Sequence, residues 1–140
     1  MIRFVRLSEV ALMPDRQTDG AAAFDIFANE DVTIRPGQPT WVSTGFGVEF
    51  PPSMVAQVWP RSGKSGQGFH IGAGLIDSDY RGEVKVMIHN LSYEVLQVKA
   101  GERIAQLTFV QLADTFAVEY SDEFATETAR GAGGFGSTGG

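Results

Sequence analysis

Short apolar or alternating segments, separated by turn residues, recur along nearly the whole chain, and helical periodicity is almost absent. Alternation with a period of two, interrupted every few residues by Gly, Pro, Asn or Asp, is typical of many short β-strands. We expect strands over residues 2–7, 24–27, 32–34, 40–43, 48–50, 54–59, 74–76, 83–89, 95–98, 103–110 and 116–120. Helix should be limited to about one turn, around residues 62–65. The pattern predicts an all-β sandwich or barrel.

The chain of 140 residues fits one domain, which we expect over residues 1–125, followed by an arm over 126–140. The last eleven residues, RGAGGFGSTGG, contain six glycines. Such a segment buries too little apolar surface to order itself, so we expect it to be mobile alone. Its arginine, phenylalanine and bare backbone are nevertheless suited to charge pairing, base stacking and phosphate contact, which suggests an arm that folds over a nucleotide.

Charge and composition narrow the class of partner. The net charge of −6 argues against a broad nucleic-acid interface, although a local cluster of arginines can still bind a small polyanion. No apolar run is long enough to span a bilayer and no signal-peptide pattern opens the chain. The absence of cysteine excludes disulfides and thiolate sites. We therefore expect a cytoplasmic protein that binds neither nucleic acid nor membrane.

Two strongly apolar segments bear on assembly. Residues 84–88, VKVMI, and 103–110, RIAQLTFV, carry more apolar surface than a small sandwich needs to bury. Surplus apolar strand surface indicates either a subunit interface or a thick monomeric core, and the residues alone favour neither.

Four segments besides the arm carry residues suited to chemistry. Asp25 lies between apolar residues on a predicted strand, and the sequence PRSG over 60–63 offers an arginine fork and backbone N–H groups for phosphate. The segment 74–84, GLIDSDYRGEV, predicts a hairpin with two acids at its mouth, one of them a general-base candidate. In GERIAQL, over 101–107, the glutamine points either at a ligand or into water.

Several other interpretations fail on spacing. An EF-hand beginning at Asp77 would require oxygen ligands where Arg81 and Ile88 stand. The glycines at 131 and 136 have P-loop spacing, but Ser137 occupies the lysine position. The chain has only two histidines, so there are few candidates for the histidine of a Ser-His-Asp triad.

Taken in order, these five segments resemble the five motifs of the homotrimeric dUTPase family. RGAGGFGSTG is similar to that family's C-terminal motif, GLIDSDYRGEV to its third, PRSG to its second and ERIAQL to its fourth. The first motif reads AAFD, ending at Asp25, where the family usually has Ala-Gly-Tyr-Asp, and Lys64 stands where a leucine usually begins the turn after PRSG. The resemblance implies a jelly-roll-like β-sandwich, or distorted barrel, assembled as a trimer.

The resemblance also implies an activity. Members of the family hydrolyse dUTP to dUMP and pyrophosphate by water attack on the α-phosphorus, which keeps uracil out of DNA and supplies dUMP for thymidylate synthesis. Mg²⁺ is the cofactor, held by substrate phosphates and waters and by no direct protein ligand. Each active site is shared by three subunits: one supplies the first, second and fourth motifs, another the hairpin, and the third the arm.

Roles follow from the motif each residue matches. Asp77 would be the base that activates water, Tyr80 would pack under the deoxyribose, and Asp25 would support the phosphate site. The residues expected to bind substrate are Arg61, Ser62, Gly63, Gly74, Leu75, Ile76, Tyr80, Lys85, Gln106, Arg130, Phe135, Gly136, Ser137 and Thr138. Arg130 would meet the γ-phosphate and Phe135 would stack on uracil.

Two alternatives remain beside this interpretation. A dCTP deaminase shares the fold and the nucleotide handling but would need a glutamate base and a cytosine-reading hairpin. A non-catalytic, regulatory nucleotide-binding trimer could lose Asp77, Arg130 or Phe135 without cost to folding, yet all three are present. The third motif and the complete arm favour the dUTPase interpretation.

Overall fold

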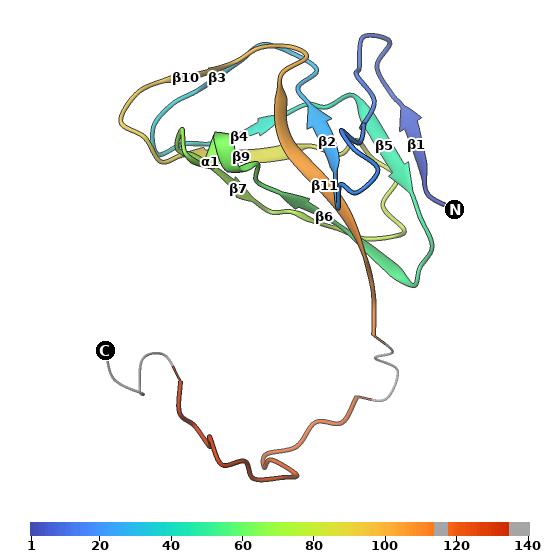
Figure 1. The fold of residues 1–140 in the computed structure, drawn as a ribbon, viewed down its shortest axis with the longest axis vertical. Helices are drawn as coiled ribbons and strands as arrows, with labels where there is room; N and C mark the ends of the chain where they lie inside the picture. Colours follow the sequence, from blue (N-terminus) through green and yellow to red (C-terminus); the bar gives the residue numbers. More distant parts are fainter. Residues whose placement is uncertain (114–117, 135–140) are drawn as a thin grey trace.

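A computed structural model describes residues 1–113 and 118–134. Within them, the chain forms short strands and a single helical turn (Figure 1). The elements are β1 (Arg3–Arg6), β2 (Phe24–Phe27), β3 (Val32–Ile34), β4 (Pro39–Val42), β5 (Phe46–Glu49), β6 (Met54–Trp59), α1 (Ser62–Ser65), β7 (Phe69–Gly72), β8 (Leu75–Ile76), β9 (Val86–Asn90), β10 (Leu96–Val98) and β11 (Arg103–Gln111). The predicted all-β class and the predicted helical turn are both confirmed.

The strands form two main sheets and two small pairs. One sheet has the order β2-β11-β6-β8 and the other β4-β9-β7, while β1 pairs with β5 and β3 with β10. Each of these strand pairs is antiparallel. Sequence neighbours are often not spatial neighbours, because β2 lies beside β11 and β4 beside β9. Long connections of this kind build a sandwich rather than a series of hairpins.

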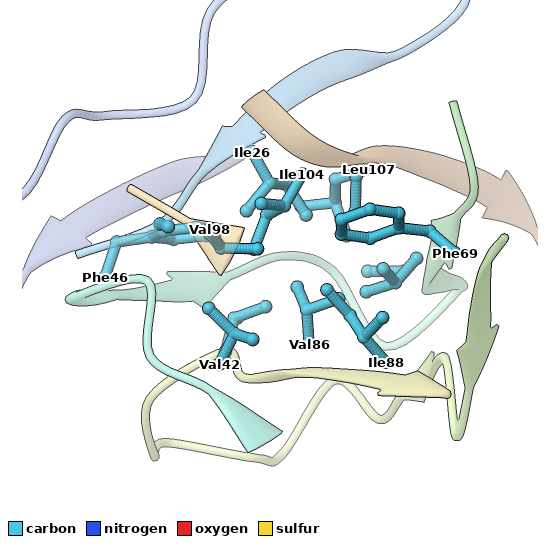
Figure 2. Packing of buried hydrophobic residues seen from close by; sticks show 14 of the residues in the cluster. Ile26, Val42, Phe46, Phe69, Val86, Ile88, Val98, Ile104 and Leu107 are labelled. Atoms are coloured by element: carbon cyan, nitrogen blue, oxygen red, sulfur yellow. The ribbon is translucent and has the colours of Figure 1, made fainter. Parts of the chain in front are cut away.

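The core lies between the two main sheets (Figure 2). Ile26 and Leu107 point down from β2 and β11, and Val42, Val86 and Ile88 point up from β4 and β9. All five are at most 1% exposed. Burying each such side chain contributes roughly 1.5–3 kcal/mol, so this layer supplies a large share of the folding free energy.

An aromatic cluster closes one end of the sandwich. Phe4, Phe24, Phe46, Phe50 and Phe109 pack with ring centroids 5.2–6.2 Å apart, mostly edge to face. Edge-to-face pairs of this kind add to the free energy of area burial. Because Phe4 and Phe46 belong to β1 and β5, the cluster joins that small strand pair to β2 and β11.

Several strand predictions were wrong in detail. β7 was not predicted, because the glycine-rich stretch before and after Phe69–Gly72 hides its alternation, and its pairing with β9 is a tertiary contact. β9 begins at Val86 rather than at residue 83, and β5 spans Phe46–Glu49 instead of 48–50. In the predicted strand 116–120, residues 118–120 are not strand, and residues 116–117 lie outside the described residues.

After β11 the chain has no further regular structure among its described residues. Segment 118–134 leads away from the sheets (Figure 1), and its hydrogen bonds join residues of the same segment, such as Arg130 to the Gly133 carbonyl. The predicted boundary between body and arm at residue 125 stays a prediction. No helix in residues 1–113 and 118–134 has the length and apolar character needed to cross a membrane.

The carboxylate of Glu83 ties the segment before β9 to the turn between β4 and β5. Its Oε1 atom accepts hydrogen bonds from the N–H groups of Thr44 (3.0 Å) and Gly45 (2.8 Å) and from the Ser43 hydroxyl. Gly45 has a φ of +71°, a conformation that favours glycine. Burial raises the pKa of Glu83, but these hydrogen bonds and Lys85 outweigh it and hold the pKa below its ordinary value.

Glu83→Gln should therefore lower the free energy of unfolding at neutral pH by about 1–3 kcal/mol, because the turn loses a charged acceptor. A carboxylate with a lowered folded pKa stabilises above its unfolded pKa, here 4.5, and loses that stabilisation as pH falls through the folded value. The difference between wild type and variant should shrink below pH 4.5. Urea unfolding at neutral pH and at about pH 3.5 measures it.

Glu49→Gln is the matched control, since Glu49 pairs with Arg3 on the surface, where such pairs contribute little. A Glu83→Gln effect of the same size at both pH values would contradict this role for the carboxylate.

Candidate active site

A pocket of about 500 Å³ lies where α1 meets β2 and β11, and we call it the Arg61 pocket. It brings together three segments that the sequence singled out, around Asp25, PRSG and Gln106. Its lining residues are Gln17, Ala21, Ala22, Ala23, Asp25, Arg61, Ser62, Gly63, Lys64, Gln67 and Gln106. The strand pairing explains this convergence, since Gln106 on β11 lies opposite Asp25 on β2 and Trp59 on β6.

Asp25 organises the charges of the Arg61 pocket. Its carboxylate, 10% exposed, lies 3.1 Å from Nε of Arg61 and 3.3 Å from Nη1 of Arg103. A buried carboxylate needs such partners to offset its desolvation. Two guanidinium groups facing one carboxylate leave this group with a net positive charge, which favours an anionic ligand.

Gln106 supports the turn that presents Arg61. Its Nε2 atom donates a hydrogen bond to the Pro60 carbonyl at 2.8 Å. The amide oxygen is not used in that bond, so the side chain can both hold the turn and accept a hydrogen bond from a ligand or its water. Ser62 and Gly63 follow in α1, whose residues are not buried, and an anion in the pocket can reach them.

A second pocket, of about 450 Å³, lies beside the segment that joins β8 to β9, and we call it the Asp77 pocket. Its lining residues are Trp41, Ala73, Leu75, Ile76, Asp77, Tyr80, Glu83, Val84 and Lys85. Five of the predicted site residues are therefore together here. An aromatic and aliphatic wall with the carboxylates of Asp77 and Glu83 and one lysine suits a flat polar ring attached to a sugar.

Gly74 does not line this pocket, but it directly precedes Leu75, which does. Its carbonyl accepts a hydrogen bond from Val58 N–H at 2.8 Å, and a Cβ at this position would stand 2.6 Å from the Val58 carbonyl oxygen. Only glycine permits this close approach of β8 to β6. The residue is therefore required for the strand pairing that places Leu75 and Ile76.

Tyr80 is held in place by its own loop. Its N–H donates to the Asp77 carbonyl at 3.2 Å, and its hydroxyl donates to the Glu83 carbonyl at 3.0 Å. A Cβ on Gly82 would lie 2.3 Å from the Tyr80 hydroxyl, so a larger residue would displace the ring. The ring remains 46% exposed and available to a ligand.

The predicted hairpin over 74–84 was wrong as a pair of bonded strands. β8 pairs with β6 in one sheet, whereas β9 pairs with β4 and β7 in the other. Segment 77–85 thus crosses from one layer of the sandwich to the other. The turn over Asp77–Gly82 depends on neighbouring residues and could be predicted locally. The strands on either side of it belong to different sheets, which the local sequence does not reveal.

The two pockets share no lining residue. Arg130, in the third predicted group, is on segment 118–134, where its Nε donates to the Gly133 carbonyl at 2.7 Å. Four further residues predicted to bind substrate lie outside the described residues: Phe135, Gly136, Ser137 and Thr138. Within one chain, the predicted site residues therefore form an Arg61 group, an Asp77 group and an arm group.

Four residues with charged or aromatic side chains, at or beside these pockets, had not been predicted to act in the site. Arg103 binds Asp25, Glu83 anchors the Asp77 segment, and Lys64 and Trp41 line the two pockets. Glu83 is part of the segment GLIDSDYRGEV and Arg103 is part of GERIAQL, so their charges within these segments could have indicated a role in the site. Trp41 gave no such signal, because it reaches the Asp77 pocket from a distant strand.

Metal binding by protein side chains alone has little support in the described residues. Among residues 1–113 and 118–134, no group of three or more histidine, aspartate or glutamate side chains is placed to hold a cation. Asp25, the acid in the Arg61 pocket, already has both oxygens engaged by arginines. This arrangement fits a cation that arrives with a phosphate ligand rather than one held in a protein cage.

Comparison with known proteins agrees with this geometry. The family model described as dUTPase matches residues 9–139. A deoxyuridine 5'-triphosphate nucleotidohydrolase of Nautilia profundicola is 41% identical over 141 residues, covering 99% of this chain and 98% of the relative. The mouse protein of the same name is 43% identical over 141 residues, covering 99% of this chain and 85% of the relative.

Solved structures show the same likeness in three dimensions. A mutant dUTPase of Staphylococcus bacteriophage 80alpha, solved with dUpNHpp, superposes with a TM-score of 0.89 at 28% identity, over 99% of this chain and 98% of that one. The jelly-roll-like β architecture predicted from the sequence is thereby confirmed. With a family match across nearly its whole length and relatives above 40% identity, this chain belongs to the dUTPase family.

Proposed function

We propose that this protein hydrolyses dUTP to dUMP and pyrophosphate. The observation that carries the proposal is the Asp77 pocket, which places a carboxylate beside Tyr80 and Lys85 in a cavity of nucleoside size. The near full-length similarity to deoxyuridine 5'-triphosphate nucleotidohydrolases supports the same reaction. We also propose that it acts in the cytoplasm, or in the host-cell cytoplasm if the protein is viral.

Nucleoside selection follows from the walls of the Asp77 pocket. The backbone of Gly74–Asp77 and the side chain of Lys85 would meet the uracil edge, and a close backbone wall would collide with the 5-methyl group of thymine. The Tyr80 ring, fixed by its hydrogen bond to Glu83, would pack under the deoxyribose and leave no room for a 2′-hydroxyl. Shape and pairing together would therefore favour dUTP over dTTP and UTP.

Asp77 is the proposed general base. Its carboxylate would orient a water molecule and accept its proton as the water oxygen forms a bond to the α-phosphorus. The bond from that phosphorus to the bridging oxygen breaks, and pyrophosphate leaves with the electron pair. Ser62 would donate to the bridging region, where leaving-group charge develops.

The Arg61 pocket would hold the phosphates. Arg61, Ser62 and Gly63 would bind the phosphate oxygens, and Gln106 would reach a phosphate or its water shell. Mg²⁺ bound to the triphosphate would neutralise charge on the phosphates and stabilise the leaving group. Asp25 keeps Arg61 oriented, and it would also support the waters of that ion.

The arm would complete the site. Arg130 would pair with the γ-phosphate, Phe135 would stack on uracil, and Gly136, Ser137 and Thr138 would close over the phosphates. Closure of such a segment excludes water and fixes the reacting geometry, which is why we propose that activity depends on it.

The separation of the three residue groups supports a homotrimer with shared active sites. One chain would supply the Arg61 pocket, a second the Asp77 pocket and the third the arm. Trp59 (50% exposed), Leu75 (66%) and Val110 (42%) leave apolar surface on β6, β8 and β11, which association would cover. A cyclic trimer places non-identical surfaces of neighbouring chains against each other, as this division of the site requires.

Substrate assays test the proposed reaction. With Mg²⁺ present, the protein should release pyrophosphate from dUTP and only slowly from dTTP, dCTP or UTP. Ammonia released from dCTP would instead indicate a deaminase. A folded protein that binds dUpNHpp but hydrolyses none of the four nucleotides would be a nucleotide-binding regulator.

Asp77→Asn should lower kcat by roughly 10²–10⁴-fold and change the affinity for dUpNHpp little, because the amide keeps the shape but cannot accept the proton. Steady-state kinetics and calorimetric titration separate the two effects. Asp79→Asn is the matched control at the neighbouring acid, which does not line the pocket. Turnover close to that of wild type would remove Asp77 from the role of base.

Mixed assemblies test the shared site. Asp77→Asn and Arg61→Gln chains should each be inactive alone. Co-expression should restore activity in about a quarter of the sites, those in which an Asp77→Asn chain supplies the Arg61 pocket and an Arg61→Gln chain supplies the Asp77 pocket. The control pairs Asp77→Asn chains with the Asp77→Asn/Arg61→Gln double variant, where no site can be complete. Mixed trimers verified by mass spectrometry but lacking activity would refute the division of the site.

Removal of residues 130–140 should lower turnover by at least about 10²-fold while the melting temperature changes by no more than a few degrees. The reason is that the described part of the arm makes its hydrogen bonds only within its own segment. Pyrophosphate release and thermal unfolding measure the two quantities. A large loss of stability would show that the arm is part of the folded body.

A further inference from the structure

The helical turn that carries the phosphate-binding residues has little stability of its own. α1 spans four residues, its N-cap Arg61 makes no side-chain capping bond, and none of its residues is buried. So short a helix, with glycine at 63 and at its C-cap, is unfavourable in isolation. Contacts from outside the helix must therefore hold the turn in place.

Lys64 makes such contacts. Its ammonium group pairs with the Glu102 carboxylate and lies 4.9 Å from the ring centroid of the buried Phe69, and its side chain is only 13% exposed. Glu102 is fixed in turn, because its other carboxylate oxygen accepts from Lys99 N–H at 2.9 Å and its carbonyl accepts from Ala28 N–H at 2.9 Å. The lysine is thus attached to a rigid part of the body.

We propose that Lys64 and Glu102 form a tether that positions Arg61–Gly63 for the triphosphate. The inference rests on the proposed function and makes both partners positioning residues. Arg61 attaches the start of the turn to Asp25, and Lys64 attaches its end to Glu102. Arg103, which follows Glu102, also contacts Asp25, so both attachments converge on the start of β11. The turn is therefore held at its start by Asp25 on β2 and by the Arg103 carbonyl, which accepts a hydrogen bond from Arg61 at 3.4 Å. Near its end it is held by Glu102, which directly precedes β11.

The charge state of Glu102 is consistent with a tether. Burial raises its pKa, but the hydrogen bonds from Lys64 and from Lys99 N–H outweigh burial and hold the pKa below its ordinary value. The carboxylate therefore stays ionised at neutral pH and keeps the ammonium group of Lys64 engaged.

Lys64 also lines the Arg61 pocket, so a direct contact to phosphate is the competing role. The two roles predict opposite effects at Glu102. If Lys64 binds phosphate directly, Glu102→Gln releases its ammonium group and strengthens triphosphate binding. If Lys64 is a tether, Glu102→Gln loosens the turn and weakens binding, as Lys64→Met does.

Calorimetric titration separates these roles when it compares four proteins: the wild type, Lys64→Met, Glu102→Gln and the double variant. Lys64→Met, which keeps the apolar stem over Phe69, should weaken dUpNHpp binding by about tenfold, and Glu102→Gln should weaken it in the same direction. The double variant should be no weaker than Lys64→Met, since one interaction is lost in both. Binding of dUMP, which lacks the outer phosphates, should change by less than about twofold. Tighter binding by Glu102→Gln, or additive losses, would overturn the tether.

Lys99→Met is the matched control, because it breaks an exposed lysine–aspartate pair with Asp31 without touching α1. It should leave the binding of both nucleotides unchanged.

Hydrogen exchange provides a readout that does not depend on activity. The N–H groups of Lys64, Ser65 and Gly66 bond to carbonyls of residues 61 and 62, and they should exchange about tenfold faster in both tether variants while the core strands keep their protection. Unchanged exchange would overturn the tether even if dUTP hydrolysis is confirmed. Faster exchange in a protein that does not hydrolyse dUTP would refute the proposed function and leave the tether standing.

Discussion

Some side chains of β11 pack in the core, and others form the hydrogen bonds that organise the Arg61 pocket. Ile104 and Leu107 are fully buried between the sheets, while Arg103 and Gln106 bond to Asp25 and Pro60. A register shift between residues 103 and 105 breaks the simple alternation of the strand. Such a bulge re-aims a side chain, and here Arg103 turns toward Asp25. Because the same strand pairs with both β2 and β6, any displacement of the core would displace the pocket.

The Asp77 pocket depends on a different constraint, the crossing of the chain between the two sheets. The chain is fixed before the crossing, at Gly74, by its contact with Val58, and within the crossing segment, at Glu83, by the turn between β4 and β5. Between these points the backbone must reverse within a few residues, and the Tyr80 hydroxyl closes the loop on Glu83. A carboxylate exposed at such a fixed turn keeps its position without being buried. That combination suits a residue that has to meet both substrate and water.

Ion pairs beside the helical turn α1 constrain the positions of their side chains more than surface pairs elsewhere do. Asp31 with Lys99 and Glu49 with Arg3 are exposed on both sides, where water screens the attraction. The pairs made by Asp25 and by Lys64 lie partly buried, where geometry and hydrogen bonding determine their value. The chain therefore concentrates its constrained charges around one short helix that its own sequence stabilises poorly.

Alternation, turn residues and motif chemistry are local properties, so the all-β class, the helical turn at Ser62–Ser65 and the segments expected to carry the site could be predicted from the sequence. The sequence did not predict β7, the sheet to which each end of segment 74–84 belongs, or the roles of Trp41 and Lys64. These depend on which distant strands pair and on which side chains then face one another, such as Lys64 and Glu102. The structure alone reveals that Arg61 and Asp77, predicted for one site, line two separate pockets of the chain. Pairing between distant strands follows from total core packing rather than from local pattern.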